Sequence, residues 1–386
     1  MKKILFLPLL QMQSGHHQVA EALMDLLKNH TDDFTFKKID LLSYTNKSLE
    51  KVITNGYLNW IRYAPETYNL AYKSFFYVPP TKKNSFKWYE PLFLKKMEQL
   101  IAEEKPDLLV CTHGFPSYLL SKLKMKGKCD LPIINVYTDF FINSVWGREG
   151  IDYHLLPSQE VKAKLSRKVP NQQLIVTGIP VHQEMTKTFT RKKHTNRLKI
   201  LLSGGNSGLG GILKLAEELK QSTNLDFLIL CGNNKKLYNE IHSWDLEHIK
   251  PLRYLSSRLE MNQLYEEVDA IISKPGGVTI SEAIQKKLPI FVHSALPGQE
   301  KINLRYLKSQ NLVFELNLTT PLESQLLSVL TDQKKMNGWE YAIDSYQQGM
   351  ELEKPEKIVD LIESILVQKT SSKQSRLVRY SSPLRI

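Results

Sequence analysis

Two side chains in this sequence stand where they could accept a proton from a reacting hydroxyl group. His16 lies in the stretch QSGHH, between an apolar run and a helical pattern, and Asp139 closes another apolar run in YTDF. Imidazole and carboxylate groups are common general bases in enzymes. The competing interpretations are a solvent-facing histidine at a helix start and an aspartate that caps the next helix. His16 and Asp139 are therefore candidate bases.

Two glycine-rich stretches could hold a phosphate group. Gly204 and Gly205 follow an apolar run in SGGNSGLGG, and Gly276 and Gly277 precede a helical pattern in SKPGGVTISEA. Glycine allows main-chain N–H groups to approach a phosphate closely, and a helix N-terminus favours negative charge. The first stretch lacks the spacing of a dinucleotide-binding fingerprint and of a P-loop. A generic diphosphate site is favoured, with a flexible turn as the alternative for the first stretch.

Polar side chains near the second glycine pair could bind sugar hydroxyls. Glu282 lies about one helical turn after Gly277, where its carboxylate could hold two neighbouring ribose hydroxyls. Thr279 and Glu282 also fit a capping box, in which the glutamate only bonds the helix start. Gln299 and Glu300, in PGQEK, offer donors and acceptors for a sugar, with a polar turn as the alternative. No HExxH, CxxC or clustered Asp/His spacing indicates a metal, so we expect neither a metal nor another cofactor.

Short apolar runs alternate with helical patterns along most of the chain. The runs lie at 3–10, 107–111, 132–137 and 174–177, and again at 199–202, 227–230, 270–272 and 289–292. This alternation predicts parallel α/β sheets, with the loops described above at the strand ends. We expect two α/β domains at 1–185 and 200–345, a basic hinge at 186–199, and C-terminal helices with a basic tail at 346–386.

Composition restricts the class of protein and of partner. The 386 residues are 42% hydrophobic and 24% charged, as in ordinary packed soluble proteins. No run approaches the ~18 apolar residues that span a bilayer. Three cysteines without a CxxC pair suit a reducing cytoplasm. The net charge of +12 predicts an anionic partner, which could be nucleic acid, a membrane surface or a phosphorylated substrate. No nucleic-acid-binding module is recognised.

The positive charge is concentrated in three stretches. Residues 54–96 hold seven basic and two acidic side chains, 187–199 six and none, and 367–386 five and none, so the remaining chain is negative. Twelve of the forty residues from 54 to 93 are aromatic. Aromatic rings beside lysines suit an anionic membrane interface, and an insertion that packs on its own domain is the alternative. The predicted membrane and acceptor contacts are Tyr57, Trp60, Tyr72, Phe75, Phe76, Lys82, Lys83 and Trp88.

The order of the motifs resembles one family. The stretches SGHHQVAEAL, VYTDF, VTGIPV, SGG, CGNN, SKPGGVTISEA and PGQE cover about residues 3–345. Together they resemble motifs of the diacylglycerol glucosyltransferases and monogalactosyldiacylglycerol synthases. The resemblance implies a GT-B architecture, in which two Rossmann-like domains face a cleft. It further implies that the C-terminal domain binds a UDP-sugar, and that the N-terminal domain contacts the membrane and the lipid acceptor.

The resemblance also implies roles for individual residues. On the donor side, the matching residues are Gly204 and Gly205 for a loop that closes on the phosphates, Gly276, Gly277 and Thr279 for the diphosphate, Glu282 for the ribose, and Gln299 and Glu300 for the hexose. On the acceptor side, His16 matches the histidine near the acceptor hydroxyl and Asp139 the aspartate of the TDF motif. Two positions depart from the family pattern, because Gln13 replaces the first glycine of G-x-G-H and Asn143 replaces a histidine.

We therefore expect an inverting transfer of a hexose, glucose more than galactose, from a UDP-sugar to diacylglycerol. The expected place is the inner face of the cell membrane, where the protein would bind peripherally. Both departures lie on the acceptor side, so a lipid acceptor of the polyprenyl-diphosphate type is an alternative. A UDP-sugar 2-epimerase would share the fold and the donor pocket without needing a lipid. A UDP-sugar sensor without catalysis would keep the donor loops and lose the base.

Overall fold

The computed structural model of the protein describes residues 1–9, 14–64, 66–67, 70, 90–187, 197–204, 211–296, 298–352, 354 and 356–367. Several side chains between 47 and 62, including that of Tyr57, lie outside this set. The other predicted residues outside it are Gly205, Tyr72, Phe75, Phe76, Lys82, Lys83 and Trp88. Most of the predicted hinge and the whole predicted tail beyond 367 also fall outside the described residues.

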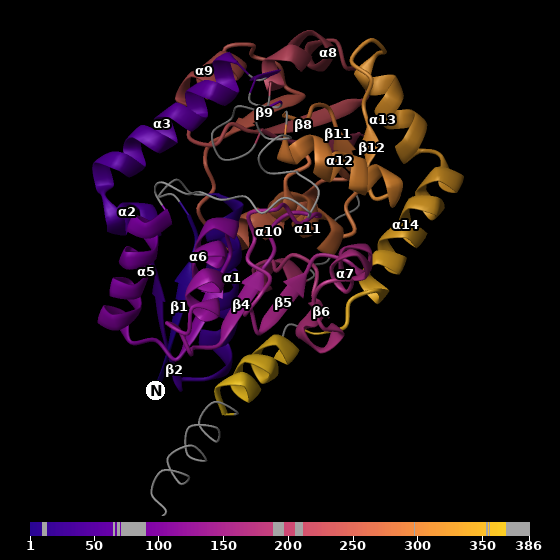
Figure 1. Ribbon diagram of the computed structural model, residues 1–386. Coiled ribbons are helices and arrows are strands. Elements are labelled where there is room, and N and C mark those ends of the chain that lie inside the picture. Colours follow the sequence, from indigo (N-terminus) through magenta and orange to yellow (C-terminus); the bar gives the residue numbers. More distant parts are fainter. Residues whose placement is uncertain are drawn as a thin grey trace, which may run out of the picture.

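The first half of the chain forms a six-stranded parallel sheet with the strand order β2-β1-β3-β4-β5-β6 (Figure 1). Its strands are β1 Lys2–Leu7, β2 Phe34–Lys38, β3 Leu108–Cys111, β4 Ile133–Val136, β5 Tyr153–Leu156 and β6 Leu174–Val176. Its helices are α1 Gly15–His30, α2 Leu41–Thr45, α3 Lys47–Tyr63, α5 Glu90–Glu104, α6 Gly114–Met125 and α7 Gln159–Leu165, with short 3₁₀ turns η1 Asn171–Gln173 and η2 Gln183–Thr186. Ile4 and Phe6 enter one apolar cluster and Leu5 and Leu7 another, so both faces of β1 are covered.

The second half repeats this architecture with the strand order β12-β11-β10-β7-β8-β9. Its strands are β7 Leu198–Ser203, β8 Leu225–Leu230, β9 Ile249–Leu252, β10 Ala270–Ser273, β11 Ile290–Val292 and β12 Phe314–Glu315. Its helices are η3 Ile212–Leu215, α8 Ala216–Lys220, α9 Lys235–His242, α10 Arg258–Glu267, α11 Gly277–Gln285, α12 Gln299–Ser309, α13 Leu322–Leu330 and α14 Gln333–Gln348. The predicted α/β class with two parallel sheets is confirmed, while the exact domain boundaries stay predictions.

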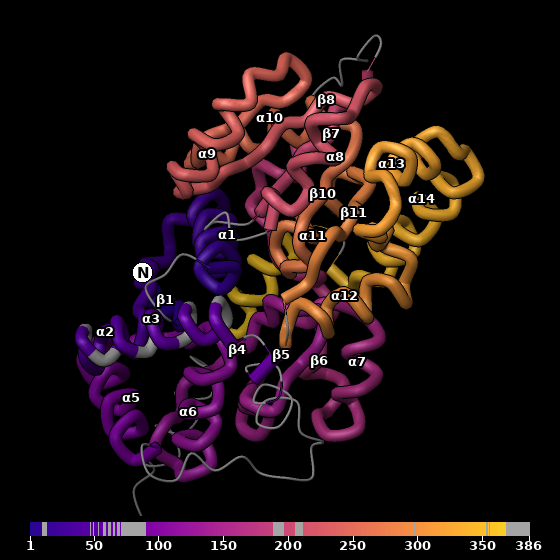
Figure 2. The backbone as a smooth tube through the Cα atoms, turned by 90° about the horizontal axis from the view of Figure 1, so that it is seen from above, coloured from indigo at the N-terminus to yellow at the C-terminus, as the bar shows by residue number. Residues whose placement is uncertain are grey.

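The two halves share part of their core. One apolar cluster contains Ile4 and Val19 of the first half together with Ile271 and Val278 of the second. Helix α1 therefore lies between its own sheet and α11, and the tube view in Figure 2 shows these two helices side by side. Since apolar burial is the main favourable contribution to folding, this shared cluster stabilises the contact between the halves.

After α14 the chain returns to the first half. The main-chain N–H of Glu351 donates to the carbonyl of Val176 over 2.7 Å, and the Tyr346 hydroxyl donates to the carbonyl of Pro157 over 2.8 Å. A last helix at 356–367 buries Ile358 and other apolar side chains in the cluster that contains α1. Figure 1 shows this yellow helix beside the first sheet rather than the second. None of the helices that the structure describes combines the length and hydropathy needed to traverse a bilayer.

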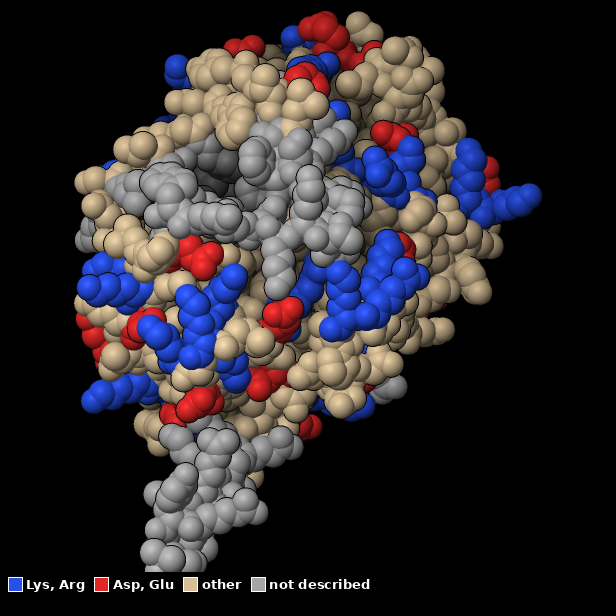
Figure 3. All heavy atoms as spheres, viewed as in Figure 1, with Lys and Arg blue, Asp and Glu red and all other residues tan. Residues whose placement is uncertain are grey.

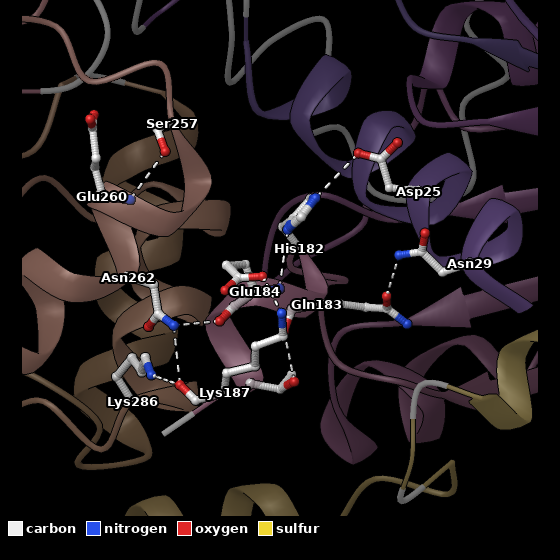
Figure 4. A network of polar contacts seen from close by, with 11 residues as sticks. Asp25, Asn29, His182, Gln183, Glu184, Lys187, Ser257, Glu260, Asn262 and Lys286 are labelled. Atoms are coloured by element: carbon white, nitrogen blue, oxygen red, sulfur yellow. Dashed lines mark hydrogen bonds and ion pairs between the residues drawn. The ribbon is translucent and has the colours of Figure 1, made fainter. Parts of the chain in front are cut away.

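The turn η2 lies at the start of the predicted hinge and is bonded to helix α1 (Figure 4). His182 Nε2 lies 3.2 Å from Asp25 Oδ2, and Asn29 Nδ2 donates to Gln183 Oε1 over 2.9 Å. These contacts fix the end of the first half before the chain crosses to the second.

The same turn is bonded to helices of the second half. Asn262 Nδ2, on α10, donates to the carbonyls of Glu184 and Lys187 over 2.6 and 3.1 Å. Lys286, at the end of α11, donates to the Lys187 carbonyl as well (Figure 4). Because Asn262 is fully buried, these bonds are shielded from competing water. The η2 turn therefore connects both halves through side chains as well as through the main chain.

Candidate active site

Loops at the carboxyl ends of the two sheets meet each other. A Cβ atom placed on Gly15, which follows β1, would lie 3.2 Å from Val278 at the start of α11. A Cβ atom on Gly277 would lie 1.9 Å from the main-chain oxygen of Thr138, which follows β4. That distance is far below any van der Waals contact, so only glycine fits at position 277. The predicted base residues and one predicted donor loop are therefore brought together.

His16 is held by two hydrogen bonds that determine which of its nitrogens is free to act as a base. Its Nδ1 lies 2.8 Å from the main-chain oxygen of Thr112 and 2.9 Å from Oγ1 of Thr138. A carbonyl can only accept, so Nδ1 carries the hydrogen and Nε2 presents a lone pair. Burial lowers the pKa of His16, against the opposing effects of Asp139 and the Thr112 bond. The side chain is therefore a neutral acceptor at neutral pH, and it is not the solvent-facing histidine of the alternative.

Asp139 is bonded to a residue of the second half. No helix begins in the stretch 140–152, so the alternative that Asp139 caps a helix is wrong. Its Oδ1 accepts a hydrogen bond of 2.9 Å from Nδ2 of Asn303, on α12. Burial raises the pKa of Asp139, while nearby His16 and the Asn303 bond act in the opposite direction. Asp139 thus lies close enough to His16 to stabilise a positive charge on the imidazole.

A second histidine beside His16 was not predicted from the sequence. His113 follows β3, and its ring packs edge-on against that of His16 with 4.6 Å between centroids. Its Nδ1 accepts from the N–H of Phe115 over 3.0 Å, so its own hydrogen lies on Nε2. Burial is the main cause that holds the pKa of His113 well below the usual value. The available signal was its position, because His113 follows β3 much as His16 follows β1.

The start of α11 decides between two interpretations of the glycine pair. The helix is capped by Gly276 without a side-chain bond, and Thr279 is already its third residue. The capping-box interpretation of Thr279 and Glu282 is therefore wrong. A Cβ atom on Gly276 would meet no atom within 4 Å, so the N-terminal end of α11 has open space beside it. Free N–H groups at such an end favour an anion.

Glu282 is buried and oriented by a tyrosine. The hydroxyl of Tyr265, on α10, donates to Glu282 Oε2 over 2.9 Å. Burial raises the pKa of Glu282, with the Tyr265 bond and the charge of Arg258 opposing it. Tyr265 was missed at the sequence level because it lies on a different helix. One carboxylate oxygen is thus engaged with the protein.

The PGQE stretch begins a helix rather than forming a polar turn. Gln299 and Glu300 are the first residues of α12, after Gly298 with a φ of 88°. Glu300 Oε2 accepts from the N–H of Leu296 over 2.7 Å, and its Oε1 lies 3.5 Å from Nζ of Lys274. Gln299 is half-buried beside it. These contacts hold Glu300 next to the SKPGG loop.

Lys274, in the SKPGG loop, and Lys214 were not predicted as site residues, and both lie near His293. His293, just after β11, is buried, and its pKa is lowered to about 4 by burial first and then by the charges of Lys274 and Lys214. Lys214 belongs to η3, which follows the first glycine stretch. Gly204 directly follows β7 and is buried. The predicted donor side therefore contains positive charge as well as glycine main chain.

Within the described part of the chain, no three His, Cys, Asp or Glu side chains are grouped so that they could hold a metal ion. The chemistry that the described groups can supply is proton acceptance at His16, with Asp139 beside it. Opposite these groups lie the helix N-terminus and lysines suited to an anion.

Sequence comparisons match the first half alone in one case and nearly the whole chain in others. Residues 16–181 match the family model described as Monogalactosyldiacylglycerol (MGDG) synthase. The chain is 39% identical over 371 residues to an uncharacterized glycosyltransferase YkoN of Bacillus subtilis, a match that covers 95% of this chain and 98% of that one. It is 25% identical over 336 residues to a processive diacylglycerol beta-glucosyltransferase of Bacillus licheniformis, covering 84% and 86%.

Solved structures support the fold. A Staphylococcus aureus MnaA–UDP co-structure matches with a TM-score of 0.58 and 14% identity, over 95% of this chain and 97% of that one. The glycosyltransferase SnogD from Streptomyces nogalater matches with a TM-score of 0.56 and 13% identity, over 95% and 99%. At such low identity these similarities concern architecture alone, and they confirm the predicted arrangement of two parallel α/β halves.

Proposed function

Because the chain belongs to the diacylglycerol glucosyltransferase and monogalactosyldiacylglycerol synthase family of GT-B glycosyltransferases, we propose that it transfers glucose from UDP-glucose to diacylglycerol with inversion. Family membership makes the chain a UDP-sugar-dependent glycosyltransferase. The choice of glucose over galactose, the diacylglycerol acceptor and the membrane contact are the proposed part. The observation that carries the proposal is the unprotonated Nε2 of His16 beside Asp139, across from the N-terminus of α11.

The donor would bind to the second half. The N–H groups at the start of α11 would contact the diphosphate, with Gly276 leaving room for its close approach. The second carboxylate oxygen of Glu282 would bind the ribose, and Gln299 and Glu300 would bind the hexose. Negative charge grows on the departing diphosphate during transfer. The helix N-terminus and Lys274 would stabilise that charge, since fixed dipoles and charges need no rearrangement at the moment of reaction.

The acceptor hydroxyl would approach from the first half. Its oxygen forms a bond to the anomeric carbon of the glucose while the bond from that carbon to the UDP oxygen breaks. His16 Nε2 takes the hydroxyl proton, and the nearby carboxylate of Asp139 stabilises the imidazolium that results. A neutral His16 is required for this role, and burial favours the neutral form. Attack from the side opposite the leaving UDP gives inversion.

The described residues also support a membrane contact on the first half. Helix α3 presents Val52, Trp60 and Tyr63 to solvent, with exposed fractions of 69%, 44% and 73%. Figure 3 shows many lysine and arginine side chains, with acidic ones between them, over the part of the same half where Figure 1 draws α5, α6 and α7. Apolar and aromatic side chains near basic ones favour anionic lipid. Peripheral binding at the inner face of the cell membrane is therefore the proposed location.

The proposal is tested by supplying the full chain with vesicles that contain diacylglycerol and either UDP-glucose or UDP-galactose, and identifying the lipid product. We expect glucosyl-diacylglycerol as the main product. A product with galactose only would overturn the choice of sugar. Transfer only to a polyprenyl-diphosphate lipid would overturn the acceptor, and conversion of UDP-N-acetylglucosamine to its 2-epimer without lipid would replace transfer by epimerisation.

A further inference from the structure

One buried side chain joins the two halves at the place where the proposed base and donor loops meet. Asn303 lies on α12 of the second half and is 1% exposed. Its Nδ2 donates to Asp139 Oδ1 over 2.9 Å and to the main-chain oxygen of Pro275 over 3.1 Å. Its Oδ1 accepts from the N–H of Phe140 over 3.0 Å. Asn303 therefore bonds the TDF loop and the SKPGG loop at the same time.

The partners of Asn303 determine the orientation of its amide. The Pro275 carbonyl and the ionised Asp139 can only accept, while the N–H of Phe140 can only donate. Rotating the amide by half a turn would place an acceptor against two acceptors and a donor against a donor. Both hydrogens and the oxygen of the amide are thus used, and a buried amide with all these bonds is rigid.

We propose that Asn303 is a positioning residue for the transfer reaction, which sets the Asp139 carboxylate beside His16 from across the contact between the two halves. This inference rests on the proposed function, because it assigns Asp139 to the stabilisation of charge on His16. Asn303 follows Glu300 by three residues on α12, so one helix turn would carry both a hexose contact and this closing contact.

The groups around Asp139 make this assignment specific. The charged or titratable group that acts on it from α1 is His16, and His113 lies behind His16 at the start of α6. From α12 the contact is the neutral amide of Asn303. A hydrogen bond from a neutral donor stabilises the ionised carboxylate and so lowers its pKa. Loss of Asn303 should therefore change the ionisation of Asp139 as well as its orientation.

The experiment compares Asn303→Ala with Asn262→Ala in the full chain. Asn262 is a matched control, because it is also a fully buried asparagine that bonds a helix of the second half to a crossing segment. It does not contact Asp139. For each protein, kcat for transfer is measured against pH, and the Kd for UDP is measured by calorimetry. Asn303→Ser, which keeps a smaller hydroxyl donor, replaces Asn303→Ala if the alanine variant does not fold.

We expect Asn303→Ala to lower kcat about tenfold or more and to move the acid limb of its pH profile upward by about one unit, the size expected for losing a hydrogen bond to a charged group. The UDP Kd should change less than about threefold, since a base-side contact is not part of donor binding. Asn262→Ala should lower the melting temperature, while the acid limb of its kcat profile should lie at the same pH as that of the wild type. Equal acid limbs for the two variants would overturn the proposal and leave Asn303 a structural contact only.

A second measurement does not depend on the acceptor. The free energy of unfolding is measured against pH for Asp139→Asn, alone and combined with Asn303→Ala, and compared with the corresponding Asp139 proteins. Because burial raises the pKa of Asp139, the Asp139 protein loses stability relative to its Asn partner as pH rises through the unfolded and then the folded pKa. The upper end of this loss should lie at higher pH in the Asn303→Ala background. If diacylglycerol transfer fails but this shift is found, the proposed function is wrong while the effect of Asn303 on Asp139 holds. If the shift is missing, the positioning role of Asn303 is wrong.

Discussion

Gly277 of the second half and Thr138 of the first approach each other so closely that a Cβ atom at position 277 would lie 1.9 Å from the threonine carbonyl oxygen. The requirement for glycine at this position therefore comes from contact between the halves. The neighbouring Gly276 has no such contact and lies beside open space. The two glycines of one motif are therefore needed for different reasons: Gly277 allows the halves to come into contact, and Gly276 leaves open space at the helix N-terminus.

This difference predicts separate effects for two alanine substitutions. Gly277→Ala should prevent the halves from closing, because the Cβ atom would overlap the Thr138 carbonyl and moving main-chain atoms apart costs free energy. We expect transfer to fall at least about 100-fold, and small-angle scattering to show a larger radius of gyration with UDP bound. Gly276→Ala should keep the compact form and weaken UDP binding, since a methyl group would occupy the open space beside the N-terminus of α11. If both variants open the molecule to the same extent, the separation is wrong.

Glu282 should contribute mainly to donor binding. Glu282→Ala is expected to weaken UDP binding by about 1–3 kcal/mol, or roughly 5–150-fold, the range for losing hydrogen bonds to a charged group. Calorimetry with UDP measures this directly. Tyr265→Phe is a milder variant for comparison, because it keeps the Glu282 carboxylate and removes only the hydrogen bond that orients it. We expect a smaller loss for Tyr265→Phe, and an unchanged Kd for Glu282→Ala would contradict the ribose role.

His16 should determine turnover without affecting the donor. His16→Ala is expected to lower kcat by about 10²–10⁴, the usual contribution of a general base, while the UDP Kd stays within about threefold. If turnover is unchanged, the proton passes to Asp139 instead.

The same residue predicts the pH dependence of the wild type. Burial lowers the pKa of His16, so the neutral ring persists to lower pH than in a free histidine. The acid limb of kcat should therefore lie below pH 6.5, and it belongs to the coupled His16 and Asp139 pair. Since His16 prefers the neutral form when folded, the free energy of unfolding should also fall as pH drops below 6.5. A limb above pH 6.5 would contradict the neutral base.

Membrane binding should depend on α3. Tyr63→Ser should weaken binding to vesicles of anionic lipid, measured by co-sedimentation, by about threefold to tenfold, since an aromatic side chain at the interface is lost. Tyr341→Ser is the matched control, because Tyr341 on α14 is 76% exposed against 73% for Tyr63. Equal binding by the two variants would place the membrane contact elsewhere.

Much of the fold could be predicted from the sequence because the central strands are continuous apolar runs. Each of the eight predicted runs contains or overlaps an observed strand, for example 270–272 in β10. The four strands not predicted carry weaker signals. β2 and β9 lie at sheet edges and mix lysine or proline with apolar residues, β12 has two residues, and β5 contains His154. Polar residues in a strand remove the apolar pattern on which the prediction depends.

The site could be predicted in part for a related reason. His16, Glu282 and the glycines belong to contiguous motifs, so their spacing carries information. Asn303 and Tyr265 act through partners far away in the chain, at Asp139 and Glu282, and no local pattern reveals such a pair. The capping-box alternative could not be rejected from spacing alone, because the helix begins two residues before Thr279 and only the structure gives that start.

The return of the chain after α14 has a mechanical consequence. The polypeptide passes between the halves twice, once after η2 and once between Gly349 and the helix at 356–367. Two bodies joined at two separate points cannot swing freely in every direction, and they keep mainly one rotation, about the line through those points. Opening for substrate exchange should therefore follow a single repeatable path. Each closure would return Asn303 to Asp139 and Gly277 to Thr138 in the same register.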